Sequence, residues 1–152
     1  MPTDAHIMRI KNSNSGSPEN CVFCKIVSRK IPSALVYEDI GYIAFLDRAP
    51  FSIGHTLVCP KKHGETVYDM TESEIGGLFA LAAKLSKSIV AAMDSDGFRF
   101  VQNNGEAANQ VVPHVHVHVI PVKMSQRGVY MDRSNPSMEE LHETAKQIRS
   151  FL

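Results

Sequence analysis

The chain contains the stretch His114-Val115-His116-Val117-His118-Val119-Ile120-Pro121, in which histidine alternates with valine. A period of two is the pattern of a β-strand with one buried face, so the sequence predicts a strand over 114–121. Its valines would point into a core, and its histidines would form a row on the other face, with neighbours roughly 6.6 Å apart. A polar strand face can contain histidine by chance. Three histidines in alternation instead favour a metal site or a site for phosphoryl transfer or nucleophilic catalysis.

The composition predicts a single cytoplasmic domain that acts on small ligands. The 152 residues suit one domain, and a hydrophobic fraction of 43% is enough for a core. Basic and acidic residues balance at 16 each, so nothing indicates a surface for nucleic acid. No apolar run approaches the roughly 18 residues of a membrane span, and no secretory signal is apparent, so no membrane partner is expected. Three cysteines, two of them in a Cys-x-x-Cys arrangement, fit a reducing compartment.

Strand patterns predict an antiparallel sheet in an α+β domain. Residues 1–19 are polar without apolar periodicity and are expected to form a mobile tail, followed by a folded domain over 20–152. Besides the histidine strand, four strands are expected, at Ala34–Glu38, Tyr42–Leu46, His55–Pro60 and Gly97–Gln102. The connections 39–41 and 103–110 are too short for parallel crossovers. An antiparallel sheet with helices packed on it is therefore expected.

Three helices are expected to accompany this sheet. The apolar residues within 22–27 suit a short helix. The motif Thr71-x-x-Glu74 is a capping box, and the apolar stripe that follows it predicts a long helix to about Met93. Asn135-Pro136 indicates a cap and first helical residue, with an amphipathic C-terminal helix over 136–152.

The motif Cys21-x-x-Cys24 has the spacing of half a four-coordinate zinc site. A complete structural site needs two more ligands, and the candidates are His63, at a strand end, and His114, the outermost histidine of the row. Cys59 alternates with apolar residues in a strand that is expected to be buried, so it is interpreted as a small core residue.

The remaining histidines allow two interpretations. His116 and His118 with a remote ligand could bind a catalytic metal, although a row whose ends lie roughly 13 Å apart cannot supply all three ligands. In the alternative, a neutral imidazole nitrogen attacks phosphorus, and nearby donors stabilise the charge on the phosphoryl oxygens. A loop shortly before the row offers such donors: Asn103, Asn104, Gly105 and Gln110. Phosphoryl transfer explains more of the chain.

Several ordered motifs from Cys21 to about Pro121 resemble the histidine triad (HIT) family, in particular its small nucleotide-binding hydrolases. The triad itself is His114-Val-His116-Val-His118-Val119-Ile120. The other matching motifs are Ile31-Pro32-Ser33, Ala44-Phe45-Leu46-Asp47, Gly54-His55-Thr56-Leu57-Val58, Pro60-Lys61-Lys62-His63 and Asn103-Asn104-Gly105-Glu106-Ala107.

The resemblance implies a five-stranded antiparallel sheet with one long helix, paired into a homodimer with one site per subunit. It implies that His116 attacks the α-phosphorus of a purine nucleoside phosphoramidate or a related AMP or GMP conjugate, forming a nucleotidyl-histidine intermediate. His118 would contact the phosphoryl oxygens, and His55 would complete the histidine cluster. Cleavage of dinucleoside polyphosphates by the same nucleophile is an alternative activity, and a non-catalytic nucleotide-binding regulator is another.

The resemblance also implies the binding residues. Asp47 would accept hydrogen bonds from both ribose hydroxyls, since an ionised carboxylate is an acceptor only. Asn103 and Gln110 would contact the phosphate. The base pocket would be formed by Val22, Phe23, Ile26 and Phe45. Zinc-containing members imply one structural zinc ion per subunit, held by Cys21, Cys24, His63 and His114.

Three residues depart from the family pattern. Arg48 occupies a position beside the ribose that is usually apolar. Asn109 replaces the glycine that usually precedes Gln110. Val111 replaces the serine of some relatives, which removes a possible hydroxyl donor to the leaving group.

Overall fold

The computed structural model describes residues 10, 12 and 17–152. The tail expected over 1–19 therefore lies mostly outside the described residues. At its end, Pro18–Asn20 forms a short 3-10 helix, η1, which leads directly into the first α-helix.

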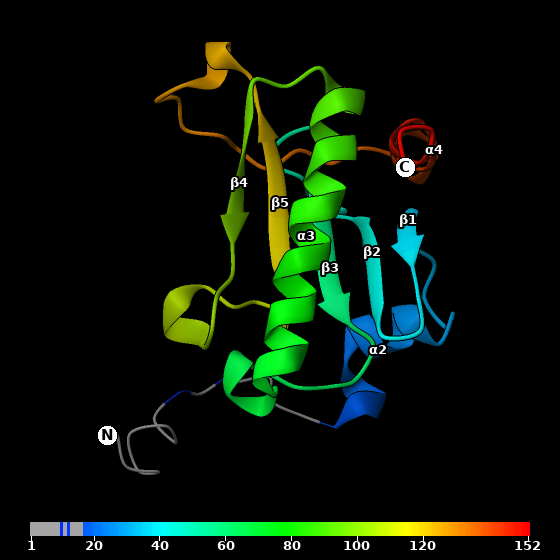
Figure 1. The fold of residues 1–152 in the computed structure, drawn as a ribbon, viewed down its shortest axis with the longest axis vertical. Coiled ribbons are helices and arrows are strands. Elements are labelled where there is room, and N and C mark those ends of the chain that lie inside the picture. The colour runs from blue at the N-terminus through cyan, green and yellow to red at the C-terminus, as the bar shows by residue number, and fades with distance from the viewer. Residues whose placement is uncertain (1–9, 11, 13–16) are drawn as a thin grey trace.

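Five antiparallel strands form one sheet in the order β1-β2-β3-β5-β4, which confirms the predicted α+β class (Figure 1). The strands are β1 (Leu35–Glu38), β2 (Tyr42–Leu46), β3 (Thr56–Pro60), β4 (Gly97–Val101) and β5 (Val117–Val122). The β1–β2 hairpin turns at Asp39, whose Oδ1 accepts hydrogen bonds from the backbone N–H groups of Gly41 and Tyr42, both at 2.8 Å. This side chain takes the place of a backbone acceptor in the turn.

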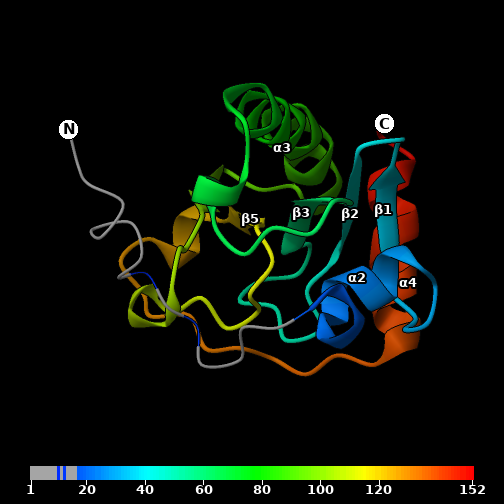
Figure 2. The ribbon, with the colours of Figure 1, turned by 90° about the horizontal axis from the view of Figure 1, so that it is seen from below.

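The sheet separates two cores, because successive side chains on a strand point to opposite faces. On β2, Ala44 and Leu46 pack with the long helix α3 (Glu72–Met93), whereas Ile43 and Phe45 pack with the short helix α2 (Val22–Val27). Figure 2 shows α3 and α2 on opposite sides of the sheet. His118 of β5 lies on the α2 face, since its neighbours Val117 and Val119 pack in the α3 core.

The helix α3 starts at the predicted capping box. Thr71 Oγ1 accepts from the Glu74 N–H at 3.1 Å, and a Glu74 carboxylate oxygen accepts from the Thr71 N–H at 2.9 Å. By length and composition this helix could cross a membrane, which the sequence pattern did not predict. Its apolar residues have another role, since one side of the helix packs on the sheet through Leu78, Leu85 and Ile89.

The last helix, α4 (Met138–Arg149), begins two residues later than predicted. Its cap is Ser137, whose Oγ accepts from the Glu140 N–H at 3.1 Å while Glu140 Oε2 accepts from the Ser137 N–H. Ser137 and Glu140 form a complete capping box, which an Asn-Pro start lacks. The helix packs against α3 and β1.

The histidine strand is shorter than predicted. β5 starts at Val117, so His114 and His116 lie in the irregular segment before it. There the chain follows Pro113, which has no N–H for a ladder, and Val115 N–H donates to the Gly64 carbonyl at 2.8 Å. The predicted alternation nevertheless holds for the valines at 115, 117 and 119, which are fully buried beneath α3.

Candidate active site

A cavity of about 670 Å³ opens on the α2 side of the sheet. All of the predicted nucleotide-binding residues except Gln110 line it. The apolar ones are Val22, Phe23, Ile26 and Phe45, and the polar ones are Asp47, Asn103, His116 and His118. An apolar pocket with a few converging polar groups is typical of a small-ligand site.

His116 is held in one tautomer by the backbone. Its Nδ1 lies 2.6 Å from the His114 carbonyl oxygen, which can only accept, so Nδ1 carries the proton and Nε2 keeps a free lone pair. The side chain is 6% exposed, and it lines the cavity. Burial lowers its pKa to about 4, which keeps the imidazole neutral near pH 7. A neutral imidazole with a free lone pair is a competent nucleophile.

A chain of hydrogen bonds sets the opposite tautomer in His118. The Phe51 N–H donates to His55 Nδ1 at 3.1 Å, so the proton of a neutral His55 is on Nε2. That Nε2–H donates to His118 Nδ1 at 2.9 Å, which places the His118 proton on Nε2. Burial lowers the pKa of both histidines to about 4. His118 therefore carries a donor N–H beside the lone pair of His116.

His55 itself is fully buried and does not line the cavity. Sequence reasoning grouped it with the catalytic histidines, and the structure places it behind His118, where it orients that ring.

Asp47 lines the cavity close to the histidines, with one carboxylate oxygen 3.6 Å from His55 Nε2. One of its oxygens accepts from the Ala49 N–H at 2.9 Å, and the other lies 3.2 Å from a guanidinium nitrogen of Arg133. The same nitrogen donates to the Ala49 carbonyl, and the guanidinium lies 4.2 Å from the centre of the Phe51 ring. Sequence reasoning missed Arg133, because nothing local marks it: its carboxylate partner is 86 residues away in the chain.

The loop before the histidine segment is built around Gln110. This side chain is buried, accepts from the Gly105 N–H at 2.7 Å and donates to the carbonyls of Glu65 and Val112. Its amide is thus engaged with the backbone, and it holds the loop in shape. Asn103, by contrast, lines the cavity.

The four predicted metal ligands are brought together beside α2. Their Sγ and Nδ1 atoms all lie within 4.8 Å of one another. Cys21 Sγ is 3.3 Å from His114 Nδ1, and Cys24 Sγ is 3.3 Å from His63 Nδ1. His114 Nε2 donates to the Pro60 carbonyl at 2.8 Å, which leaves its Nδ1 lone pair facing the thiols.

Two sulfurs and two imidazole nitrogens form a donor set that fits tetrahedral zinc. The third cysteine, Cys59, is fully buried in the adjacent core, where the sequence placed it.

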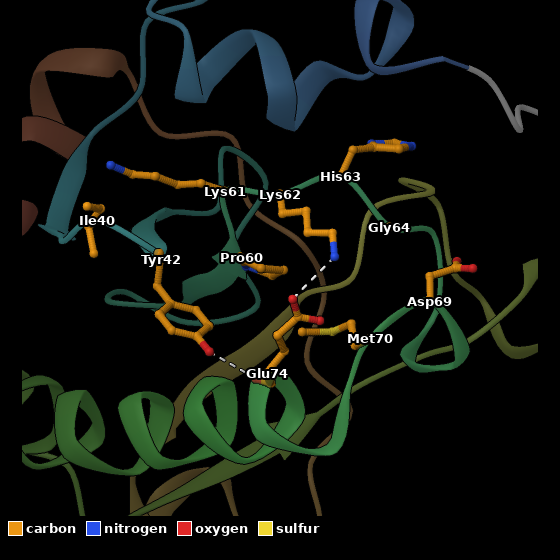
Figure 3. A pocket seen from close by; sticks show the side chains of 11 residues that line it. Ile40, Tyr42, Pro60, Lys61, Lys62, His63, Gly64, Asp69, Met70 and Glu74 are labelled. Atoms are coloured by element: carbon orange, nitrogen blue, oxygen red, sulfur yellow. Dashed lines mark hydrogen bonds and ion pairs between the residues drawn. The ribbon is translucent and has the colours of Figure 1, made fainter.

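A smaller cavity of about 210 Å³ lies between the end of β3 and the start of α3, next to His63 (Figure 3). Its lysines are paired: Lys62 with Glu74 at 3.3 Å, and Lys61 with Glu38 at 2.9 Å. The Tyr42 hydroxyl donates to the Glu74 carbonyl at 3.0 Å, which ties β2 to the helix. These contacts join structural elements, and both lysine charges are already balanced.

Comparison with known proteins agrees with the geometry. A family model described as HIT domain matches residues 28–125. The chain belongs to the HIT family. It is 46% identical over 103 residues to Protein hit of Bacillus subtilis, covering 68% of this chain and 71% of that protein. It is 36% identical over 135 residues to adenosine 5′-monophosphoramidase hnt1 of Schizosaccharomyces pombe, covering 88% and 98% respectively.

A solved HIT structure shows the same fold. The zinc-bound histidine triad family protein of Mycobacterium smegmatis superimposes with a TM-score of 0.79 at 32% identity, covering 89% of this chain and 94% of that one.

The three departures from the family pattern have defined places in this HIT chain, and all three residues line the cavity. Asn109 adopts a left-handed conformation, with φ of 63°, which asparagine tolerates better than most residues other than glycine. The loop therefore keeps a conformation that suits glycine. Arg48 is exposed beside Asp47, and Val111 is 77% exposed.

Proposed function

We propose that this HIT protein is a nucleotide hydrolase that cleaves the α-phosphorus bond of purine nucleoside phosphoramidates or related conjugates through a nucleotidyl-His116 intermediate. The observation that carries the proposal is the tautomer of His116. Its Nδ1–H donates to the His114 carbonyl, which leaves the Nε2 lone pair free on a ring that lines the cavity. The relationship to a named adenosine 5′-monophosphoramidase supports this substrate class.

The reaction proceeds in two displacements. His116 Nε2 attacks the α-phosphorus, and the bond from phosphorus to the leaving nitrogen breaks as that nitrogen takes a proton from solvent. Water then attacks the same phosphorus, the bond to His116 breaks, and the proton of the water is released to solvent. His118 Nε2–H donates to a phosphoryl oxygen in both steps, where negative charge builds up.

The remaining residues bind and orient the nucleotide. The base lies among the apolar residues of α2 and β2, and the ribose hydroxyls donate to the Asp47 carboxylate. Asn103 contacts the phosphate, while Gln110 acts by holding the loop before the histidine segment in shape. A structural zinc ion, one per subunit, would be held by Cys21, Cys24, His63 and His114, where it would tie α2 to the segment that carries the nucleophile.

We also propose that the protein is a cytoplasmic homodimer paired through β4. This strand is an edge of the sheet, and edge strands present unpaired backbone groups. Its aromatic residues Phe98 and Phe100 are 45% and 37% exposed. A second copy of the chain would pair the edge and cover both rings.

The test replaces the nucleophile. His116→Asn is expected to abolish turnover of an adenosine 5′-phosphoramidate while AMP binding persists, because asparagine cannot carry the nucleotidyl group. His142→Asn, which changes an exposed histidine on α4, is the matched control and should be fully active. Rapid quench with labelled substrate should trap a covalent nucleotidyl adduct on the wild type and none on the His116→Asn variant.

Other outcomes identify the alternatives. Faster turnover of diadenosine polyphosphates than of the phosphoramidate would assign the second activity. Binding of AMP with neither an adduct nor turnover of either substrate would assign the non-catalytic regulator. Full activity of His116→Asn would refute the mechanism.

A further inference from the structure

The end of the cavity around Asp47 carries more positive charge than its carboxylate balances. We define the ribose end of the cavity by Asp47, Arg48 and Arg133, which all line it. Among the described residues that line the cavity, Asp47 is the only carboxylate. The lowered pKa of His118 keeps that ring neutral near pH 7, so it adds no charge. Two arginines and one carboxylate on this part of the lining leave a net positive charge.

Contacts with three groups hold the Arg133 side chain beside Asp47. It comes from the segment between β5 and α4, which runs along the α2 side of the sheet (Figure 2). Its neighbour Ser134 donates its N–H to the Pro50 carbonyl at 2.9 Å, which attaches the segment to the loop after Asp47. The guanidinium contacts the Asp47 carboxylate, the Ala49 carbonyl and the face of Phe51. Despite these contacts the Arg133 side chain remains 42% exposed.

The contacts use only part of what Arg133 offers. The hydrogen bonds to Asp47 and Ala49 both come from Nη1, and a guanidinium has five N–H donors in a planar fork. Such a fork matches the oxygens of a phosphate group in two-point contact. Arg48 lies next in sequence to Asp47 and is exposed, so a second guanidinium can approach the same position.

We propose that the ribose end binds a second phosphate, carried on the 2′ or 3′ oxygen of the ribose. The proposal rests on the proposed function in one respect, the placement of the ribose hydroxyls at Asp47. Both N–H groups of Arg133 Nη1 are used by Asp47 and Ala49, so the donors that remain for a phosphate are on Nε and Nη2. Because the guanidinium contacts the Asp47 carboxylate, a phosphate on either ribose oxygen lies within reach of these donors. The substrate class is then a nucleoside 5′-conjugate that also carries a ribose phosphate.

The test compares three probes by calorimetry on the full chain: 5′-AMP, adenosine 2′,5′-bisphosphate and adenosine 3′,5′-bisphosphate. One bisphosphate should bind roughly tenfold more tightly than 5′-AMP, the size expected for charged hydrogen bonds at a partly exposed site. The preferred isomer identifies the ribose oxygen. In Arg133→Gln that preference should fall to about twofold or less, since the charge and the fork are lost.

Arg127→Gln is the matched control, because Arg127 is exposed in the same segment and does not line the cavity. It should keep the full preference. A second measurement needs no variant: in the wild type the preference should shrink when salt is raised from about 0.05 M to about 0.5 M, because screening weakens exposed charge pairs.

The outcomes separate this inference from the proposed function. If the wild type binds 5′-AMP and neither bisphosphate binds more tightly, the ribose-phosphate site is refuted and the proposed function stands. Full preference in the double variant Arg48→Gln/Arg133→Gln would refute it as well. If 5′-AMP itself does not bind, the nucleotide-binding function fails first and the inference falls with it.

Discussion

The buried histidine His55 should make the fold sensitive to mild acid. Burial is the main cause that lowers its pKa from 6.5 to about 4, and the Asp47 charge partly opposes this effect. The other charged or titratable groups that face it are Arg133, His116 and His118. Because the pKa is lower in the folded chain than in the unfolded chain, the unfolded chain binds protons first as the pH falls. The free energy of unfolding should therefore decrease as the pH is lowered from about 6.5 towards 4.

The magnitude follows from the two pKa values, 6.5 and about 4. At about pH 7.5 the His55 side chain is mostly neutral in both the folded and the unfolded chain. At about pH 5 it is mostly protonated in the unfolded chain and mostly neutral in the folded chain. Linkage then gives a loss of about 2 kcal/mol from this one residue between these two pH values.

The assay is urea denaturation at both pH values, followed by circular dichroism. The loss of stability on acidification should be about 2 kcal/mol smaller in His55→Gln than in the wild type, whatever the substitution does to stability at neutral pH. His142→Gln, at an exposed position on α4, should show the loss of the wild type unchanged. Equal losses in the wild type and His55→Gln would refute the reasoning. So would an NMR titration that places the pKa of His55 in the folded protein near 6.5.

Three further perturbations test the loop, the metal and the edge strand. Asn109→Val should lower the free energy of unfolding by roughly 1–2 kcal/mol, because a β-branched residue is strained at φ of 63°, whereas Asn109→Gly should be close to neutral; urea denaturation measures both. Cys24→Ser should reduce bound zinc, measured by metal analysis, from about one ion per chain to well below half, and unchanged stoichiometry would contradict the site. Phe98→Asp should shift the protein from dimer to monomer in light scattering, because it adds charge to the proposed interface, and a persistent dimer would exclude β4.

The sequence predicts the features that short stretches of chain determine by their own interactions. The valines at 115, 117 and 119 alternate because one side of the segment is core, and the Thr71 capping box is complete within four residues. The same holds for the spacing of Cys21 and Cys24, which one turn at the start of α2 brings into one cluster with His63 and His114. Each of these patterns carries its own cause, so the sequence alone was enough to detect it.

Other features depend on contacts between distant segments, and no local pattern encodes them. Arg133 meets Asp47 only because the segment after β5 returns along the sheet. The sequence predicts that Gln110 contacts the phosphate, since no local pattern links its amide to the backbone groups of Glu65 and Gly105 that engage it in the structure. The start of β5 at Val117 was missed for a related reason. A period of two persists through an extended segment whether or not a neighbouring strand pairs with it.

The neighbours of the histidine row explain why three identical side chains can do different work. An imidazole has two nitrogens, and its chemistry depends on which one a fixed partner engages. A backbone acceptor engages Nε2 of His114 and Nδ1 of His116, and this leaves the first with a lone pair toward the thiols and the second with one for the cavity. His118 instead receives a proton from His55 and so presents a donor. The acceptor for His116 is the carbonyl of His114, so any shift of His114 also moves the group that orients the His116 ring. The cluster of Cys21, Cys24, His63 and His114 and the cavity are therefore joined through one residue. If the proposed zinc ion and the proposed nucleophile are correct, loss of the metal should alter the orientation of His116 although the metal does not touch the nucleotide.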